Sequence, residues 1–398
     1  MKKSKGREGK DKEIFSQLSE EINLLLLLLR EDITDEKLKN FNVKKINWET
    51  FVQLALHHRV FPILYIKLNE LKHFSIPESV MVVFQKKYQH NVFSMLQLTS
   101  EMEKLGNLFN KNDISALFLK GPILADNIYG DISLRTSKDL DILISPTDIQ
   151  STEELLLSCG YVKEEEKSIL NEDRWRTHHS VFYHSNFNFS VEIHWRLNDK
   201  PDKEPTFSAL WERRRTSNLT GQPINILGEE DLFLYLISHG ARHGWFRLRW
   251  LLDIDRFVRK GVIWENYKKI IKEYSNEHLV GQSLILANRL LHTPIGEDLY
   301  KLLVSKSYII ADMALNFIKG SEINQSFPKE LVTFHQHYIW VLQKNILQKI
   351  RYLLILSYPS YTDYQLLRLP KKVHFLYFPL RPFLFAGRKL KILKVKEN

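Results

Sequence analysis

Three acidic residues have the types and spacing that metal-dependent chemistry requires. Asp139 and Asp141 open an apolar run, and on a β-strand residues i and i+2 project to the same face. Two carboxylates so close repel each other unless a proton or a cation lies between them, and Mg²⁺ prefers carboxylates together with substrate phosphates. Glu192, on the polar face of another strand-like run, would supply a third carboxylate. Three carboxylates on neighbouring strands are typical of metal-assisted phosphoryl or nucleotidyl transfer.

The same acids have a simpler interpretation, as a turn cap, a solvated strand residue and part of an exposed polar face. The residues before them favour the metal. Lys120 and Gly121 offer a cation, a glycine turn and a helix N-terminus, which together can hold a phosphate group. Arg135, four residues before the first aspartate, could contact phosphate as well. We therefore expect an anion site beside the carboxylates.

Histidines provide two further candidate groups. His239 and His243 are spaced i, i+4 and share a helix face, as zinc ligands do, but the sequence shows no third ligand for them. We expect them to pack or hydrogen-bond near the cleft, as accessory residues. His194 follows Glu192 by two positions on the same strand face, so it is a candidate for a role beside the metal, with His178-His179 and His184 in the same cluster. The alternative is an ordinary polar-face residue.

The elements that must position these residues form an α+β unit. Short apolar runs bounded by Gly, Pro, Ser or Asn predict strands, and longer periodic stretches predict helices. The strands are expected at 114–119, 140–144, 180–184 and 188–195, with a helix over 147–158 capped by Thr147. Flanking regions are helical, notably 232–239, 248–258 and 279–291. The prediction is a small mixed-sheet core embedded between helical regions, helix-rich overall.

Composition limits the class of protein. The chain has 398 residues, of which 44% are hydrophobic, and this excludes a disordered or collagen-like protein. Cys159 is the only cysteine, so a disulfide framework is excluded and a reducing, cytoplasmic location is expected. Six consecutive leucines at 24–29 are too few to span a membrane and predict a buried helix segment.

The net charge of +10 is unevenly distributed. Residues 341–398 contain twelve Lys or Arg and two acids, so the whole surplus lies in this segment and the rest of the chain is balanced. We expect the following units: a disordered basic tail at 1–12, a helical region at 13–112, the catalytic core at 113–200, a second helical region at 201–340, and a basic aromatic extension at 341–398. The extension has three interpretations: a docked helical extension, a peripheral membrane contact, or a nucleic-acid-binding segment.

The motifs together resemble a known family. Leu119-Lys120-Gly121, Arg135, Asp139-Leu140-Asp141 and Val191-Glu192-Ile193-His194-Trp195 are similar to motifs of the bacterial uncharacterised nucleotidyltransferase family, within the polymerase-β-like superfamily. The resemblance extends over about 45–385, through His58-Arg59-Val60-Phe61-Pro62 and His239-Gly240-Ala241-Arg242-His243.

This resemblance implies an EC 2.7.7-like enzyme that moves a nucleoside monophosphate from an NTP, such as ATP, with Mg²⁺ or Mn²⁺. Asp139, Asp141 and Glu192 would be both catalytic residues and metal ligands. The residues implied in nucleotide binding are Lys120, Gly121, Arg135 and Ser137. The superfamily usually has Gly-Ser where this chain has Lys120-Gly121-Pro122.

Several functions fit these residues. The acceptor could be a small molecule, a peptide or an RNA, and the oligomeric state is not fixed by the sequence. A second hypothesis is a catalytically silent module that binds a nucleotide or partner and docks at the membrane surface through 341–398. A third is a toxin-like nucleotidyltransferase that acts on tRNA or protein.

Overall fold

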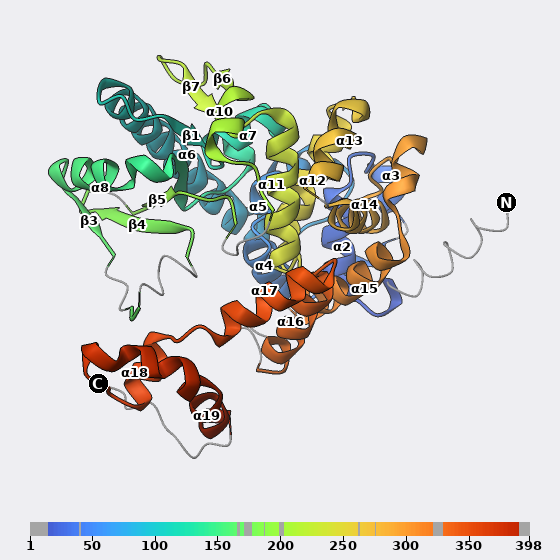
Figure 1. Ribbon diagram of the computed structural model, residues 1–398. Helices are drawn as coiled ribbons and strands as arrows, with labels where there is room; N and C mark the ends of the chain where they lie inside the picture. The colour runs from blue at the N-terminus through green and yellow to red at the C-terminus, as the bar shows by residue number, and fades with distance from the viewer. Residues whose placement is uncertain are drawn as a thin grey trace.

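The computed structural model describes residues 15–39, 41–164, 168–170, 177–186, 188–198, 203–261, 263–274, 276–320 and 329–389. The expected disordered tail at 1–12 lies outside the described residues. Within the described part, a mixed sheet is surrounded by helices, so the expected α+β class is confirmed (Figure 1). No helix among these residues is both long and apolar enough to cross a bilayer.

Seven strands form one sheet in the order β3-β4-β5-β2-β1-β7-β6. The strands are β1 (Ala116–Phe118), β2 (Asp139–Ile144), β3 (Tyr161–Lys163), β4 (His179–His184), β5 (Ser190–His194), β6 (Arg215–Ser217) and β7 (Ile224–Ile226). β2 runs parallel to β5 and antiparallel to β1, and β1 pairs in parallel with β7, which makes the sheet mixed. The sheet therefore continues past residue 200, where the core was expected to end.

The two faces of the sheet have different surroundings because side chains alternate along each strand. On one face, Leu140, Ile142, Val191 and Ile193 are buried in a core shared with Met102 and other residues of α6. The opposite face carries the acidic residues of β2 and β5. Leu117 and Leu143 on this face belong to the larger core formed with α11 and α12. One face of the sheet is thus purely structural, and the other combines packing with polar residues.

Helices before the sheet and within its connections carry the chain around both faces. They are α2 (Glu20–Leu29), α3 (Asp35–Leu38), η1 (Val43–Lys45), α4 (Trp48–His57), α5 (Phe61–Glu70), α6 (Glu78–Lys111), α7 (Pro122–Tyr129), η2 (Ile132–Leu134), η3 (Pro146–Asp148), α8 (Ile149–Ser158) and α10 (Phe207–Glu212). The leucine run lies in α2 and five of its six leucines are fully buried, as expected for a core helix. The α8 helix is capped by Asp148, one residue later than the Thr147 that we expected.

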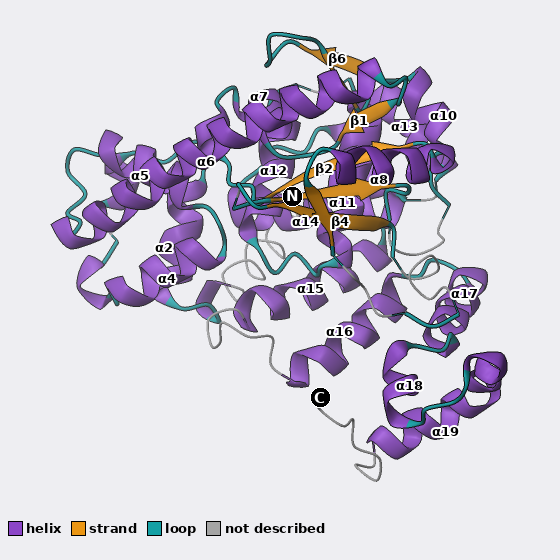
Figure 2. Ribbon diagram, turned by 90° about the vertical axis from the view of Figure 1, so that its left-hand side faces the viewer, coloured by secondary structure: helices purple, strands orange, loops and turns teal. Residues whose placement is uncertain are grey.

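The later helices complete the main body and form the C-terminal extension. They are α11 (Glu229–Arg242), α12 (Leu248–Arg259), α13 (Trp264–Glu273), α14 (Glu277–Leu291), η4 (Glu297–Leu302), α15 (Ser305–Gly320), α16 (Lys329–Leu342), α17 (Ile346–Ser357), α18 (Tyr361–Leu366), η5 (Lys371–Leu376) and α19 (Tyr377–Lys389). Leu342 at the end of α16 is buried in the main core, so the expected boundary at 340/341 lies inside a helix. The extension after it is more separate, and both views place α18 and α19 at the periphery (Figures 1 and 2).

Candidate active site

The carboxylates predicted from the sequence lie on adjacent strands. The parallel register of β2 and β5 places Asp141 beside Glu192, Leu143 beside His194 and Asp139 beside Ser190. The Asp141 side chain is 2% exposed and the Glu192 side chain 22% exposed. Asp139, two residues before Asp141 on the same strand face, is partly buried. The structure therefore brings the three acids to one polar face of the sheet, as expected.

Two cations approach this acidic face. Lys120 follows β1, and its Nζ atom lies 2.9 Å from Oδ1 of Asp141. The same ammonium lies 5.5 Å from the ring centroid of Tyr235 on α11, which covers this end of the sheet. His194 places its Nε2 atom 3.2 Å from Asp141 Oδ1 and 3.3 Å from Glu192 Oε2. Asp141 thus has two cationic or hydrogen-bonding neighbours at one oxygen.

These neighbours divide the acids into two electrostatic classes. Burial and the nearby Asp141 carboxylate raise the pKa of Asp139 above its ordinary value. Burial alone would also raise the pKa of Asp141, but Lys120 and His194 outweigh it, and that pKa lies below its ordinary value. The pKa of Glu192 is lowered in the same way, because His194 outweighs the effect of burial. Asp141 and Glu192 are therefore held as anions, while Asp139 is the acid that depends most on an additional cation.

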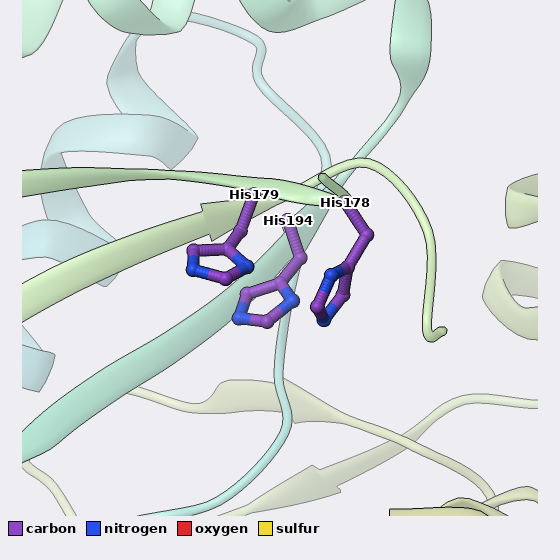
Figure 3. A group of neighbouring side chains, drawn as sticks. All are labelled: His178, His179 and His194. Atoms are coloured by element: carbon purple, nitrogen blue, oxygen red, sulfur yellow. The ribbon is translucent and has the colours of Figure 1, made fainter. Parts of the chain in front are cut away.

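Imidazole rings extend the cluster beyond the acids. His178, His179 and His194 offer ring nitrogens that all lie within 4.8 Å of one another, and Asp141, Glu192 and His194 offer a second such set. Figure 3 shows the three rings gathered together, with His194 between the other two. The rings of His179 and His194 are stacked with centroids 4.9 Å apart, and His178 lies edge-on to His194 at 5.0 Å. Three members of the expected histidine cluster therefore gather around His194, whereas the fourth, His184, lies at the other end of β4, where it pairs with Tyr161 of β3.

A short loop before β2 determines the position of Asp139. The Ser137 hydroxyl donates to the Asp139 carboxylate at 3.2 Å. Gly121 approaches the same place, where its φ of +77° and ψ of −141° lie in a region that only glycine adopts easily. A Cβ atom at this glycine would lie 3.6 Å from the Asp139 carbonyl oxygen and 3.9 Å from the Ser137 hydroxyl oxygen. The turn that we expected at Lys120-Gly121 therefore lies directly against the loop of the first aspartate.

Arg135, which we expected to contact phosphate, has a buried acid as its partner. Its guanidinium donates to both oxygens of Asp253 on α12, with Nε–Oδ1 and Nη2–Oδ2 distances of 3.0 Å. The Tyr129 hydroxyl donates to the same carboxylate at 2.8 Å. Arg135 is 2% exposed and Asp253 is fully buried. This pair joins the Asp139 loop to α12, and the predicted phosphate contact of Arg135 stays a prediction.

A cationic cleft of about 730 Å³ opens beside the Asp139 loop. Ser137 and Lys138 line it from the loop, Asn188 and Phe189 from the start of β5, and Phe93 and other residues from α6. The basic side chains on its wall are Arg59, Lys87, Lys138 and Arg247, with His57 and His90. None of its described lining residues is acidic, and these four Lys and Arg side chains form no ion pair with any described residue.

Two arginines of this cleft, Arg59 and Arg247, are held by helix termini. Arg59 follows α4 with φ +56°, a left-handed conformation that is uncommon for a residue other than glycine. Buried His58 accepts a hydrogen bond from the backbone N–H of Leu248 at 3.3 Å, which joins the end of α4 to the start of α12. Burial and repulsion from Arg59 lower the pKa of Arg247 to about 10. The two guanidinium groups are partly buried, and the negative charge that acts on both of them is that of Asp139.

His239 and His243 belong to an aromatic group on α11 and α12. The His243 ring stacks on Trp250 with centroids 5.1 Å apart, and His239 meets Trp250 edge-on at 5.2 Å. Burial and the nearby Lys120 hold the pKa of His239 well below its ordinary value. The two histidines thus pack on Trp250, which is one of the roles that we expected for them, and no described metal-ligand group includes either ring.

The sequence of the chain matches a known protein family. A model of the uncharacterised nucleotidyltransferase family matches residues 44–292, which is more than half of the chain. The chain belongs to this family. The match includes the acids on β2 and β5, the Lys120-Gly121 turn and both cleft arginines. No curated protein matches the chain.

One solved structure is similar to this nucleotidyltransferase family member. It is the crystal structure of an antigenic nucleotidyltransferase-like protein from Paracoccidioides brasiliensis, with 16% sequence identity and a TM-score of 0.32. The similarity covers 51% of this chain and 96% of that chain.

Sequence reasoning did not assign a role to Arg59, Arg247, His178 or His179. The two arginines are far apart in sequence, and only the contact between α4 and α12 brings them together. His178 and His179 were noticed as histidines near the hairpin, but the pairing of His179 with His194 across β4 and β5 was needed to place them beside the acids. The sequence signal for this placement was the alternation of polar and apolar residues along β5, continued into β4.

Proposed function

We propose that this chain is a metal-dependent nucleotidyltransferase that moves a nucleoside monophosphate from an NTP to an acceptor. The observation that carries the proposal is the placement of Asp139, Asp141 and Glu192 on one sheet face beside a cationic cleft. Carboxylates bind divalent ions, and the cleft matches the phosphates of a nucleotide in charge. Family membership supports the same class of reaction.

The residues of the acidic face fit a divalent cation. Oδ2 of Asp141 is buried and has no hydrogen-bond partner among the described residues, although an unpaired carboxylate oxygen is costly to bury. A metal ion bound by Asp141 and Glu192, with Asp139 and phosphate oxygens, would satisfy it and would also relieve the repulsion between the aspartates. Mg²⁺ is the proposed ion and Mn²⁺ the alternative. When bound, such an ion neutralises the charge that develops on the phosphates.

The cleft provides a place for the NTP. Arg59, Arg247 and Lys138 would pair with the triphosphate, because arginine forks match phosphate oxygens and these three cations form no ion pair within the part of the chain that the structure describes. Its volume of about 730 Å³ lies within the usual range for small-molecule sites. Ser137 lines this cleft and donates to the Asp139 carboxylate, so the α-phosphate would lie next to Asp139.

The proposed reaction is a displacement at the α-phosphorus. The acceptor oxygen forms a bond to this phosphorus, the bond to the bridging oxygen breaks, and pyrophosphate leaves. Glu192 is more exposed than Asp141, the residue beside it on β2, and it would receive the proton of the acceptor. Positioning and electrostatic stabilisation supply most of the rate in reactions of this kind.

The acceptor stays open within this proposal. A small molecule, a peptide, a protein side chain and an RNA end, such as that of tRNA, are all compatible with the carboxylate face. The assay for it is mass spectrometry of a cell extract that has been incubated with the protein, Mg²⁺ and labelled NTPs. An acceptor is identified by the gain of one nucleoside monophosphate.

Pyrophosphate release tests the reaction itself. Each NTP is assayed in the cell extract with Mg²⁺ and with Mn²⁺, using the wild-type protein and the Asp139→Asn and Asp141→Asn variants. We expect pyrophosphate release with at least one NTP and loss of this release in both variants. The control is Asp148→Asn, which should retain release, because Asp148 lies in η3, after β2 and outside the cluster of acids. Thermal unfolding of each variant shows whether it is folded. Release by a folded Asp141→Asn variant would refute the assignment of the carboxylates.

One observation favours a second candidate, a catalytically silent nucleotide-binding module. Lys120 already neutralises Asp141 with an internal ammonium at 2.9 Å, at a position where the superfamily usually has small residues. In a silent module the NTP binds in the cleft with or without metal, and Arg247→Gln weakens binding, but no pyrophosphate appears with any acceptor mixture. Nucleotide binding and pyrophosphate release, measured on the same sample, therefore distinguish the two candidates.

A further inference from the structure

The three histidines beside the acids have an arrangement that the proposed magnesium site does not use. The Nδ1 atoms of His178, His179 and His194 are all buried, and none of them has a hydrogen-bond partner among the described residues. Nε2 of His194 is also buried without a hydrogen-bond partner among these residues, and four unpaired ring nitrogens in one buried cluster are unusual, because buried polar atoms are normally satisfied. Figure 3 shows the three rings side by side.

The second nitrogen of two of these rings is directed to a carboxylate. Nε2 of His194 lies 3.2 Å from Asp141 and 3.3 Å from Glu192, and Nε2 of His179 lies 3.6 Å from Glu192. Histidine ligands of metals nearly always direct their other ring nitrogen to a carboxylate, carbonyl or water, which fixes the tautomer and leaves the first nitrogen able to bind. Nε2 of His194 approaches its carboxylates without forming a hydrogen bond, and in both His179 and His194 the nitrogen that is not directed to a carboxylate is Nδ1.

We propose that His178, His179 and His194 bind one divalent transition-metal ion of the zinc class through their Nδ1 atoms, with Asp141 and Glu192 as its supporting carboxylates. Three neutral imidazoles with an open fourth position form a known type of zinc coordination. Imidazole favours Zn²⁺, Co²⁺ and related ions, whereas Mg²⁺ prefers oxygen ligands. This site is distinct from the carboxylate oxygens that face the proposed nucleotide, and it can be filled when no NTP is present.

A ring cluster without metal is the competing explanation. Stacked and edge-on imidazoles attract each other as other aromatic rings do, and they can pack without an ion. That explanation accounts for the ring contacts but leaves four buried ring nitrogens without a hydrogen-bond partner among the described residues. A metal ion accounts for both, together with the direction of the two Nε2 atoms toward carboxylates.

Metal binding without nucleotide tests the proposal. The full chain is stripped with a chelator and titrated with Co²⁺, whose visible absorption reports nitrogen coordination, in the presence of excess Mg²⁺ to fill oxygen sites. Zn²⁺ is then added in competition. We expect one Co²⁺ per chain, displaced by one Zn²⁺ and unaffected by Mg²⁺.

Two variants and one control locate the ion. His178→Ala removes a ligand that is outside the acidic set and should weaken Zn²⁺ binding at least tenfold, since even the loss of a supporting carboxylate weakens metal sites by about 10–100-fold. Glu192→Gln removes a supporting carboxylate and should weaken Zn²⁺ binding by about 10–100-fold. His184→Ala is the matched control, because His184 lies at the other end of β4, outside the cluster, and its Nδ1 accepts from the Asn186 backbone N–H at 3.2 Å.

The result that overturns the proposal is equal Zn²⁺ affinity in His178→Ala and His184→Ala, or no stoichiometric Co²⁺ binding by the wild type. Thermal unfolding in chelator shows whether each variant is folded, and His178→Gln replaces the alanine variant if that one is not. The inference rests on the proposed function only for the role of the neighbouring acids. Zinc binding without pyrophosphate release would leave it standing and would count against the transferase alone.

Discussion

Replacing Lys120 by methionine would expose the electrostatic cost of the buried Asp141 carboxylate. Lys120 Nζ lies 2.9 Å from Asp141 Oδ1, and the two side chains are 14% and 2% exposed. Removal of one partner from a buried ion pair costs about 3–5 kcal/mol, because the other charge is left uncompensated. His194 remains 3.2 Å from the same oxygen, so we expect the lower end, about 3 kcal/mol.

The assay is urea unfolding of the wild type and Lys120→Met in chelator at pH 7. The matched control is Lys163→Met, which breaks a 2.6 Å pair with Glu153 that is half exposed and should change stability by about 1 kcal/mol or less. A divalent ion at 100 times its dissociation constant should then restore about 2.7 kcal/mol to Lys120→Met, because it replaces the missing ammonium.

The pH dependence of this difference follows from the direction of the Asp141 shift. Lys120 and His194 lower the pKa of Asp141 in the folded wild type, so this group stabilises the fold above the ordinary aspartate pKa, and the contribution is lost as pH falls through the folded value. In Lys120→Met the pKa of Asp141 rises, and the carboxyl takes up a proton first. The difference between the two proteins should therefore narrow below about pH 4. A loss of less than about 1 kcal/mol at pH 7 in chelator would refute this reasoning.

Three further predictions concern other parts of the molecule. Asp253→Asn leaves Arg135 buried and unpaired, so it should lower the free energy of unfolding in urea by about 3–5 kcal/mol, and no metal should restore it. The control is Asp312→Asn, whose carboxylate belongs to an exposed pair, and it should cost about 1 kcal/mol or less. Equal losses of stability in the two variants would contradict a structural role for the buried pair. Asp141 and Glu192 outweigh burial and raise the pKa of His194. In chelator the wild type should therefore lose stability as pH rises above about 6.5, whereas His194→Gln should not. Parallel stability profiles of the two proteins over this pH range would exclude a raised pKa for His194. If the basic extension contacts an anionic membrane, Leu354→Glu on the exposed apolar face of α17 should reduce the fraction of protein that sediments with anionic vesicles. Ile309→Glu, at an exposed position on α15, is the control and should leave that fraction unchanged. Unchanged sedimentation of Leu354→Glu would argue against α17 as the contact.

The parts of the fold with strong local patterns could be predicted from the sequence. β2 and β5 have alternating or continuous apolar residues bounded by turn residues, and the leucine run of α2 is hydrophobic enough to require burial. β3, β6 and β7 were not predicted, because each has only three residues and, unlike β1, none lies within a continuous apolar run. The place of β6 and β7 in the sheet depends on Phe118 pairing with Ile226, a contact between distant segments.

The candidate site was predictable to the same degree. Asp139 and Asp141 share a face because of their spacing, and a parallel pairing with β5 is enough to bring Glu192 beside them. The roles of the basic residues were less accessible, because a guanidinium reaches whichever carboxylate the tertiary fold presents. Arg135 meets Asp253 from α12, and Arg247 comes near enough to Arg59 to be repelled by it, and neither relation has a signature within its own segment.

The pairing of β1 with β7 also constrains how the protein is made. β1 is an inner strand of the sheet, but its partner on one side is synthesised only after the whole of 119–223 has left the ribosome. Until then one edge of β1 has unpaired backbone groups, and exposed edges are sites of aggregation. Chains that stall or are cleaved before Ile226 would therefore carry the carboxylates of β2 on an unfinished sheet. Expression fragments that end near residue 200 should precipitate under conditions in which fragments that include β7, α11 and α12 remain folded.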